Sequence, residues 1–346
     1  MLPTTWFLLI LSLTTGTMIT MSSSHWLLAW IGLELNTLAI IPIITKMHHP
    51  RTTEAAIKYF LTQAMASALI MFSSTLNAWI TGQWTITQLQ YPPATMMLTL
   101  ALAMKLGLVP IHFWLPEVMQ GTTINTAMLL TTWQKIAPLT LLCMMTNHLN
   151  IQMLLTLSLL STLMGGMTGL NQTQTRKIMA YSSITHMGWL LITLIIAPNL
   201  ALLTMLFYLL MTITMFMTLN TTSAKTITDL GPTWTHSPTI TALMMFTLLS
   251  LGGLPPMSGF APKWLILKEM VSLNLMPICL TMALASLLSL FFYLRLAHLT
   301  VTTAPPTTTT TKHNWRYKPQ MMKMISTQIM ASILLLPLLP LLQNTT

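Results

Sequence analysis

The chain carries very little charge for its length. Only 6% of its 346 residues are charged, with 15 Lys or Arg and 5 Asp or Glu, against about a quarter of the residues in soluble globular proteins. Hydrophobic residues make up 53% of the sequence, and the mean hydropathy is +0.69. Too little polar surface remains to cover a water-soluble particle of this size. These proportions exclude an ordinary soluble enzyme and indicate a membrane protein.

Cysteines and cofactor-binding motifs are also scarce. The two cysteines, Cys143 and Cys279, are too few to ligate an iron–sulfur cluster or a thiolate zinc site from this chain alone. The sequence has no glycine-rich dinucleotide fingerprint, no P-loop and no HExxH motif. We therefore expect this chain to bind no cofactor and no metal.

The net charge of +10 does not indicate nucleic-acid binding, because the basic residues do not cluster with aromatic residues. Lys and Arg instead follow the positive-inside rule. With the N-terminus placed inside, eleven basic residues fall in inside connections and only Lys268 falls outside. This distribution places the C-terminus outside and predicts membrane lipids, and no nucleic acid, around the chain.

Long apolar runs account for most of the sequence. A helix needs about 20 apolar residues to cross the bilayer core, and the first run lacks the basic segment of a secretory signal, so we expect it to remain as a span. The runs predict an all-α polytopic membrane protein with about eleven spans, at about 3–21, 25–45, 57–80, 95–116, 123–146, 150–170, 174–197, 200–220, 238–266, 275–298 and 324–343. A Thr/Pro-rich, basic surface connection is expected at 299–323, before a terminal helix in 324–346.

Two short motifs indicate an internal repeat. Leu106–Pro110 and Leu251–Pro255 share the pattern LGxxP at an offset of 145 residues, which also carries the first span onto the sixth. We expect two five-helix halves, 1–146 and 150–298, in one membrane domain over 1–346. An odd number of spans in each half makes the halves inverted in the membrane. Chance similarity between Leu/Gly/Pro-rich segments is the alternative.

Four charged residues fall near the middle of their predicted spans: Glu34, Lys105, Lys135 and Lys263. Each costs roughly 2.5 to 3.5 kcal/mol at the centre of a membrane helix. Together they cost on the order of 10 kcal/mol, comparable to the stability of a whole fold, which favours a function over structural ion pairing or snorkelling. Lys, unlike Arg, loses its proton readily when desolvated. The three embedded bases are all Lys, which by itself favours proton exchange only slightly.

Helix-breaking residues adjoin two of these lysines. Pro110 follows Lys105, and a group of Gly and Pro residues precedes Lys263: Gly252, Gly253, Pro255, Pro256 and Gly259. An interrupted helix frees backbone polar groups, which is tolerated at membrane depth only in a protein interior or beside a hydrated cavity. A simple kink between packed helices is the alternative.

Two histidines also fall within the predicted spans. His112 follows the first break, and His186 lies in the middle of the seventh span. An imidazole there could relay protons near neutral pH. The alternative is that each histidine is only a buried, hydrogen-bonded residue.

Three segments resemble the antiporter-like membrane subunits of respiratory complex I. They are Met104–Glu117 (MKLGLVPIHFWLPE), the pair Gln134-Lys135, and Leu251–Trp264 (LGGLPPMSGFAPKW). The similarity covers essentially the whole chain, and the length and the Met- and Thr-rich composition are most similar to members from animal mitochondria, in particular mammals. Unlike the longer bacterial members, this chain lacks three N-terminal helices, which leaves the charged positions in place.

The resemblance implies a subunit of the proton-pumping NADH:ubiquinone oxidoreductase of the mitochondrial inner membrane. In that membrane, the charge rule places the N-terminus in the matrix and the C-terminus in the intermembrane space. The resemblance also implies that Glu34 pairs with Lys105, and that Lys135 and Lys263 continue a hydrated axis. Other complex I subunits, including neighbouring antiporter-like subunits, are the implied partners. NADH, flavin, iron–sulfur clusters and ubiquinone are expected in those other subunits.

Two further functions stay open at this point. A free-standing cation/proton antiporter could use the same inverted halves, although a sodium site prefers several carboxylates and only Glu34 lies deep in a span. A scaffold that transmits conformational change without conducting protons is the other alternative.

Overall fold

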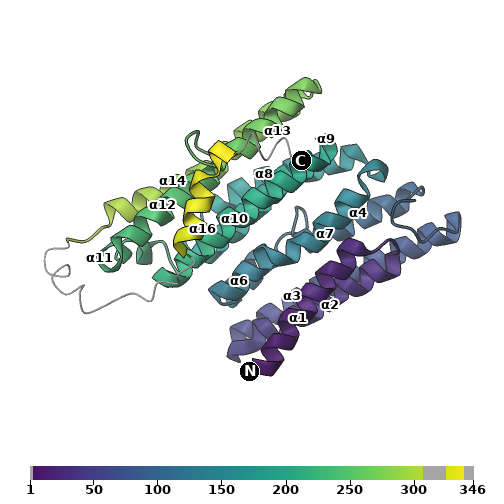
Figure 1. The fold of residues 1–346 in the computed structure, drawn as a ribbon, viewed down its shortest axis with the longest axis horizontal. Coiled ribbons are helices and arrows are strands. Elements are labelled where there is room, and N and C mark those ends of the chain that lie inside the picture. Colours follow the sequence, from purple (N-terminus) through teal and green to yellow (C-terminus); the bar gives the residue numbers. More distant parts are fainter. Residues whose placement is uncertain (1–2, 307–324, 339–346) are drawn as a thin grey trace. The chain divides into compact units, whose positions relative to one another are not determined.

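The computed structural model describes residues 3–306 and 325–338, in which every regular element is a helix. The chain forms two compact units, Met1–Ser161 and Thr162–Thr346. Within each unit the long helices lie side by side, as the neighbouring α1 and α2 show in the first unit and α9 and α10 in the second (Figure 1). The two units are described in turn.

The first unit contains seven α-helices and the beginning of an eighth among its described residues. They are α1 (Pro3–Ser22), α2 (Trp26–Ile44), α3 (Pro50–Thr81), α4 (Pro92–Leu106), α5 (Trp114–Gly121), α6 (Ile124–Thr131), α7 (Trp133–Met144) and α8 (Ile151–Leu170), with the 3₁₀ turns η1 (Thr45–Met47) and η2 (Thr146–His148). Prolines occupy the first turns of α3 and α4, where no backbone donor is lost. Gly82 and Gly107 end these helices with φ of +71° and +76°.

The second unit continues from α8 with the same alternation of long and short helices. They are α9 (Thr175–Ile196), α10 (Pro198–Thr222), α11 (Thr233–His236), α12 (Pro238–Gly252), α13 (Phe260–Ser272), α14 (Met276–Thr302) and α16 (Ile325–Leu334), with the 3₁₀ turns η3 (Thr228–Leu230) and η5 (Leu336–Leu338). Proline again lies in the first turn of α10, α12 and α14.

Seven of the described helices are long and apolar enough to cross a membrane: α1, α2 with η1, α3, α8, α9, α10 and α14. Three other predicted spans, 95–116, 123–146 and 238–266, are each divided into two shorter helices. The predicted all-α polytopic architecture with broken helices is confirmed. The tenth span continues to Thr302, and residues 307–324 of the predicted connection and 339–346 of the terminal segment lie outside the described residues.

The interruption of the fifth span, between α6 and α7, was not predicted. Thr132 lies between these helices with φ of −107° and ψ of −73°. The hydroxyls of Thr131 and Thr132 bond to carbonyls one turn back, at 3.0 Å to Ala127 O and 2.6 Å to Met128 O. Pro138 in the next turn removes a further backbone donor. Threonine back-bonding and proline together loosen the helix directly before Lys135.

Equivalent contacts in the two units support an internal repeat. A Cβ added to Gly16 would meet Gly32 O at 2.9 Å and the Asn36 side chain, and a Cβ added to Gly165 would meet Tyr181 O at 3.3 Å and the side chain of Thr185. Each residue of the first set lies 149 positions before its counterpart in the second. The first two helices of the two units therefore cross at equivalent positions.

A short backbone pairing repeats in the same way. The amide of Trp26 donates to Trp84 O, and the amide of Thr175, 149 positions later, donates to Lys225 O, both at 3.1 Å. The offset falls to 146 at the ends of α4 and α12, where Gly107 and Gly253 are equivalent. Connections of different length explain why the repeat deviates from the uniform 145 that the LGxxP motif suggests.

Replacing Gly16 by Ala should destabilise the crossing of α1 and α2 by about 1 to 3 kcal/mol, because the methyl group cannot fit between the two backbones. The thermal midpoint of the detergent-solubilised assembly measures the effect. Thr15→Ala, which removes an exposed side chain from the same helix, is the matched control. Equal midpoints for the two variants would contradict the close contact.

Candidate functional site

Lys105 and Lys135 line one cavity of the first unit. The side chains are 6% and 2% exposed, and the cavity measures about 10 Å³, which is about the space that one water molecule needs. The other lining residues come from α2 to α7 and the segment around them: Leu33, Asn36, Thr37, Tyr59, Gln63, Leu106, Trp114, Leu130, Gln134, Ala137 and Pro138. Two lysines that are 30 residues apart in the sequence thus share one buried space.

Both lysines lie beside an interruption of a helix. Lys105 is in the last turn of α4, two residues before the Gly107 cap, so the negative end of the helix dipole favours its charged form. Lys135 is the third residue of α7, where the positive end of a helix dipole disfavours an ammonium. The two lysines of one cavity therefore differ in their electrostatic surroundings.

Several polar atoms around this cavity lack hydrogen-bond partners among the described residues. They are Lys105 Nζ, both side-chain amide atoms of Asn36, and Gln63 Nε2. Gln134 Nε2 donates to the Asn36 carbonyl at 3.4 Å and connects α7 to α2. Buried polar groups of this kind are normally satisfied by protein or by ordered water. The cavity is therefore a polar centre within an apolar unit.

Glu34 lies beside the cavity, since its neighbours Leu33 and Thr37 line it. The Thr37 hydroxyl lies 2.9 Å from Glu34 O and 3.2 Å from Glu34 Oε2. No nitrogen–oxygen distance within 4 Å joins the Glu34 and Lys105 side chains among the described residues. The implied Glu34–Lys105 pair is thus not a direct salt bridge in this structure.

Lys263 lines a second cavity, of about 20 Å³, in the second unit. Its Nζ donates to Gly252 O at 2.9 Å, so the lysine caps the end of α12 from the beginning of α13. A Cβ on Gly253, whose φ is +82°, would lie 3.0 Å from this nitrogen. His186 lines the same cavity, and its ring centroid is 5.7 Å from that of Tyr208. The structure therefore brings together two of the predicted residues, Lys263 and His186.

The predicted helix breaks lie where the sequence indicates. Pro110 belongs to the segment between α4 and α5, and Pro255, Pro256 and Gly259 belong to the segment between α12 and α13. A side chain at Gly259 would collide with the Ser250 carbonyl. Only glycine therefore allows the returning chain to approach α12 this closely.

His112 is buried but lines neither cavity. Its Nδ1 lies 3.3 Å from Pro110 O, its ring lies 4.2 Å from that of Phe113, and its Nε2 has no hydrogen-bond partner among the described residues. The structure thus separates His112 from the lysines, whereas it places His186 beside one.

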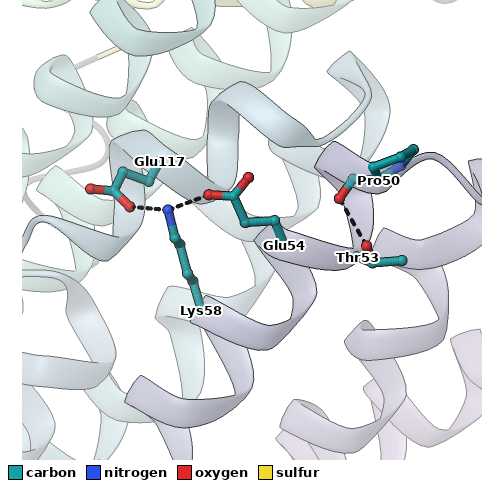
Figure 2. A network of polar contacts seen from close by, with 5 residues as sticks. All are labelled: Pro50, Thr53, Glu54, Lys58 and Glu117. Carbon is teal, nitrogen blue, oxygen red and sulfur yellow. Dashed lines mark hydrogen bonds and ion pairs between the residues drawn. The ribbon is translucent and has the colours of Figure 1, made fainter.

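A surface ion-pair network joins α3 to α5. Lys58 Nζ lies between Glu54 Oε1, at 2.6 Å, and Glu117 Oε2, at 2.7 Å (Figure 2). All three side chains are well exposed, so the pairs contribute little stability. The i,i+4 spacing predicts the pair of Glu54 and Lys58, but no local pattern predicts Glu117. In the described part of the chain, no three or more His, Cys, Asp and Glu residues are grouped as metal ligands.

Lys105 and Lys135, which are buried in the first unit, and Lys263, which is half-buried in the second, lie beside helix breaks, as expected of antiporter-like membrane proteins. Residues 23–289 match the family described as "NADH:quinone oxidoreductase/Mrp antiporter, TM", and residues 290–343 match "NADH dehydrogenase subunit 2 C-terminus". The chain belongs to the NADH-ubiquinone oxidoreductase chain 2 family.

Relatives and solved structures agree with this assignment. The chain is 55% identical to NADH-ubiquinone oxidoreductase chain 2 of Mareca americana over 96% of each chain, and 52% identical to that of Osphranter robustus over 99% of each. A chain of respiratory complex I from Thermus thermophilus is 26% identical, with a TM-score of 0.85 over 98% of this chain and 78% of that one. The Mrp complex from Dietzia sp. shares the fold, at 17% identity and a TM-score of 0.76 over 83% of this chain and 59% of that one.

Replacing Gly253 by Ala should lower the turnover of the assembled NADH–ubiquinone oxidoreductase by about tenfold, because the methyl group displaces the Lys263 ammonium from Gly252 O. Gly82→Ala is the matched control. Gly82 has a similar φ, so it bears the same backbone cost of about 1 kcal/mol, but a Cβ there has nothing within 4 Å. An equal loss of turnover in Gly253→Ala and Gly82→Ala would show that backbone strain alone causes the effect.

Proposed function

We propose that this chain is a core membrane subunit of the proton-pumping NADH:ubiquinone oxidoreductase and carries protons along Glu34, Lys105, Lys135 and Lys263. Electron transfer from NADH to ubiquinone takes place in other subunits and drives this movement. One observation carries the proposal: Lys105 and Lys135 are buried around a single cavity, each beside the end of a helix.

The chemistry of the cavity suits protons better than metal cations. Two lysine side chains line the space, and no carboxylate is among its lining residues. A sodium ion prefers several oxygen ligands of negative charge, whereas lysine can hold and release a proton when water is excluded. The lining therefore disfavours a free-standing cation/proton antiporter.

The two helix ends give the proton transfer a direction. Lys105 at the end of α4 is favoured as an ammonium, and Lys135 at the beginning of α7 is favoured as a neutral amine. A proton therefore rests on Lys105 while Glu34 is charged. Loss of the Glu34 charge, or its movement away, weakens this preference and lets the proton pass to Lys135 and onward to Lys263.

The surroundings of the chain follow from the same proposal. We place it in the mitochondrial inner membrane among other complex I subunits, including antiporter-like neighbours, with the N-terminus in the matrix and the C-terminus in the intermembrane space. Its halves, 1–146 and 150–298, are inverted relative to each other. NADH, flavin, iron–sulfur clusters and ubiquinone belong to the other subunits.

Lys135→Met should reduce proton pumping by the assembled complex at least about tenfold, since Met fills a similar space but cannot carry a proton. Proton uptake per NADH oxidised in proteoliposomes measures this loss. Lys268→Met, which removes an exposed lysine of α13, is the control and should pump normally.

Unchanged pumping per NADH in the Lys135→Met complex would refute the proposed path. The non-conducting scaffold would then be the better account, provided that Glu34→Gln and Lys263→Met also pump normally. Cation exchange by the chain alone in liposomes would instead support the free-standing antiporter.

A further inference from the structure

The two lysine cavities share two equivalent positions of the repeat. The offset of 149, established by the crossings at Gly16 and Gly165, relates Thr37 of the first cavity to His186 of the second. The same offset relates Tyr59 to Tyr208, and both tyrosines line their cavities. Each cavity therefore contains a lysine from the broken helix, a polar residue from the second helix and a tyrosine from the third.

The offset also relates Glu34 to Ser183. Glu34 lies in α2 and Tyr59 in the neighbouring α3, and Ser183 and Tyr208 occupy the matching positions of the neighbouring α9 and α10. The helix pair that carries each tyrosine is thus repeated, and in the first unit the second helix contributes the carboxylate that makes no direct salt bridge with Lys105.

The burial of these tyrosines points to a use for the hydroxyl. Tyr59 is 1% exposed and Tyr208 is 2% exposed, and both rings are fixed by aromatic neighbours, Tyr59 by Trp114 at 5.8 Å and Tyr208 by His186 at 5.7 Å. Phenylalanine would fill this space without a buried polar group. Indeed α10 buries Phe207 beside Tyr208, so an aromatic side chain in this helix does not itself need a hydroxyl.

We propose that Tyr59 and Tyr208 are equivalent proton-relay residues, one for each cavity, whose hydroxyls connect the second helix of each unit to the lysine of the broken helix. This inference rests on the proposed function and deepens it. Tyr59 supplies the connection between Glu34 and the Lys105 cavity.

The relay step is balanced without any further reactant. A tyrosine hydroxyl can donate one hydrogen bond and accept others. When the lysine ammonium or a cavity water passes a proton to the hydroxyl oxygen, a new O–H bond forms. The original O–H bond breaks and its proton moves to the next acceptor, so the phenol remains neutral. The lysine becomes an amine, and the acceptor gains the proton.

The test uses the complete complex with three variants, Tyr59→Phe, Tyr208→Phe and the control Tyr293→Phe. Each variant keeps the ring and removes one buried hydroxyl, and Tyr293, which is 1% exposed, lines neither cavity. Proton uptake per NADH oxidised and the solvent deuterium isotope effect on turnover are measured in proteoliposomes. We expect pumping to fall about tenfold in the two relay variants with a larger isotope effect, and Tyr293→Phe to match the wild type.

Wild-type pumping and isotope effects in the assembled Tyr59→Phe and Tyr208→Phe complexes would overturn the relay. Lys135→Met, measured in parallel, separates this failure from a failure of the proposed function. If Lys135→Met still abolishes pumping, only the relay is refuted. If Lys135→Met pumps normally, the proposed function is refuted as well. A loss of pumping without a change of isotope effect, matched by Tyr293→Phe, would also overturn the relay. The relay predicts the same result for both tyrosines. If one variant does not assemble, the other alone therefore tests the relay.

Discussion

The constraint behind this structure is that a membrane interior offers no water to unpaired backbone groups or to isolated charges. In this chain the unpaired backbone groups and the isolated charges occur at the same positions. Lys263 bonds the last carbonyl of α12, and Lys105 lies at the end of α4, where free carbonyls favour an ammonium. The interruptions after α4 and α12 therefore each stabilise a lysine, and Lys263 also satisfies a backbone carbonyl at its interruption.

Much of this arrangement could be predicted from the sequence because its signals are strong and local. A charge within an apolar run is conspicuous, which identifies Lys105, Lys135 and Lys263, and adjacent glycine and proline residues identify the breaks beside Lys105 and Lys263. The break at Thr132 has no such signal. Threonine is abundant throughout the chain, and only the bonds from Thr131 and Thr132 to the preceding turn reveal its effect.

Other features depend on contacts between distant segments, which no local pattern contains. Asn36 and Gln63 lie in apolar helices and become a polar centre only because α2 and α3 meet α4 and α7 around the cavity. The absence of a direct Glu34–Lys105 salt bridge likewise depends on side-chain distances. The LGxxP motifs indicate the repeat in the sequence. The residue offset between its two halves could be determined only from the helix crossings at Gly16 and Gly165.

The two halves differ in where they carry a charged residue. At the offset of 146, Glu117 of α5 corresponds to Lys263 of α13, and Trp114 corresponds to Phe260. The first half places its lysine before the break and a surface carboxylate after it, whereas the second half places its lysine after the break. The same scaffold therefore holds its charge on opposite sides of the interruption in the two halves.

The small size of the cavities has a consequence for pumping. A continuous column of water through the membrane would conduct protons in both directions and dissipate the gradient. Cavities of about 10 and 20 Å³ hold on the order of one water each, too few for such a column within either cavity. In the proposed path, lysines that change charge and hydroxyls that reorient after each transfer connect these waters. Under that proposal, the dependence on side chains is what allows the charge of Glu34 to control when a proton moves.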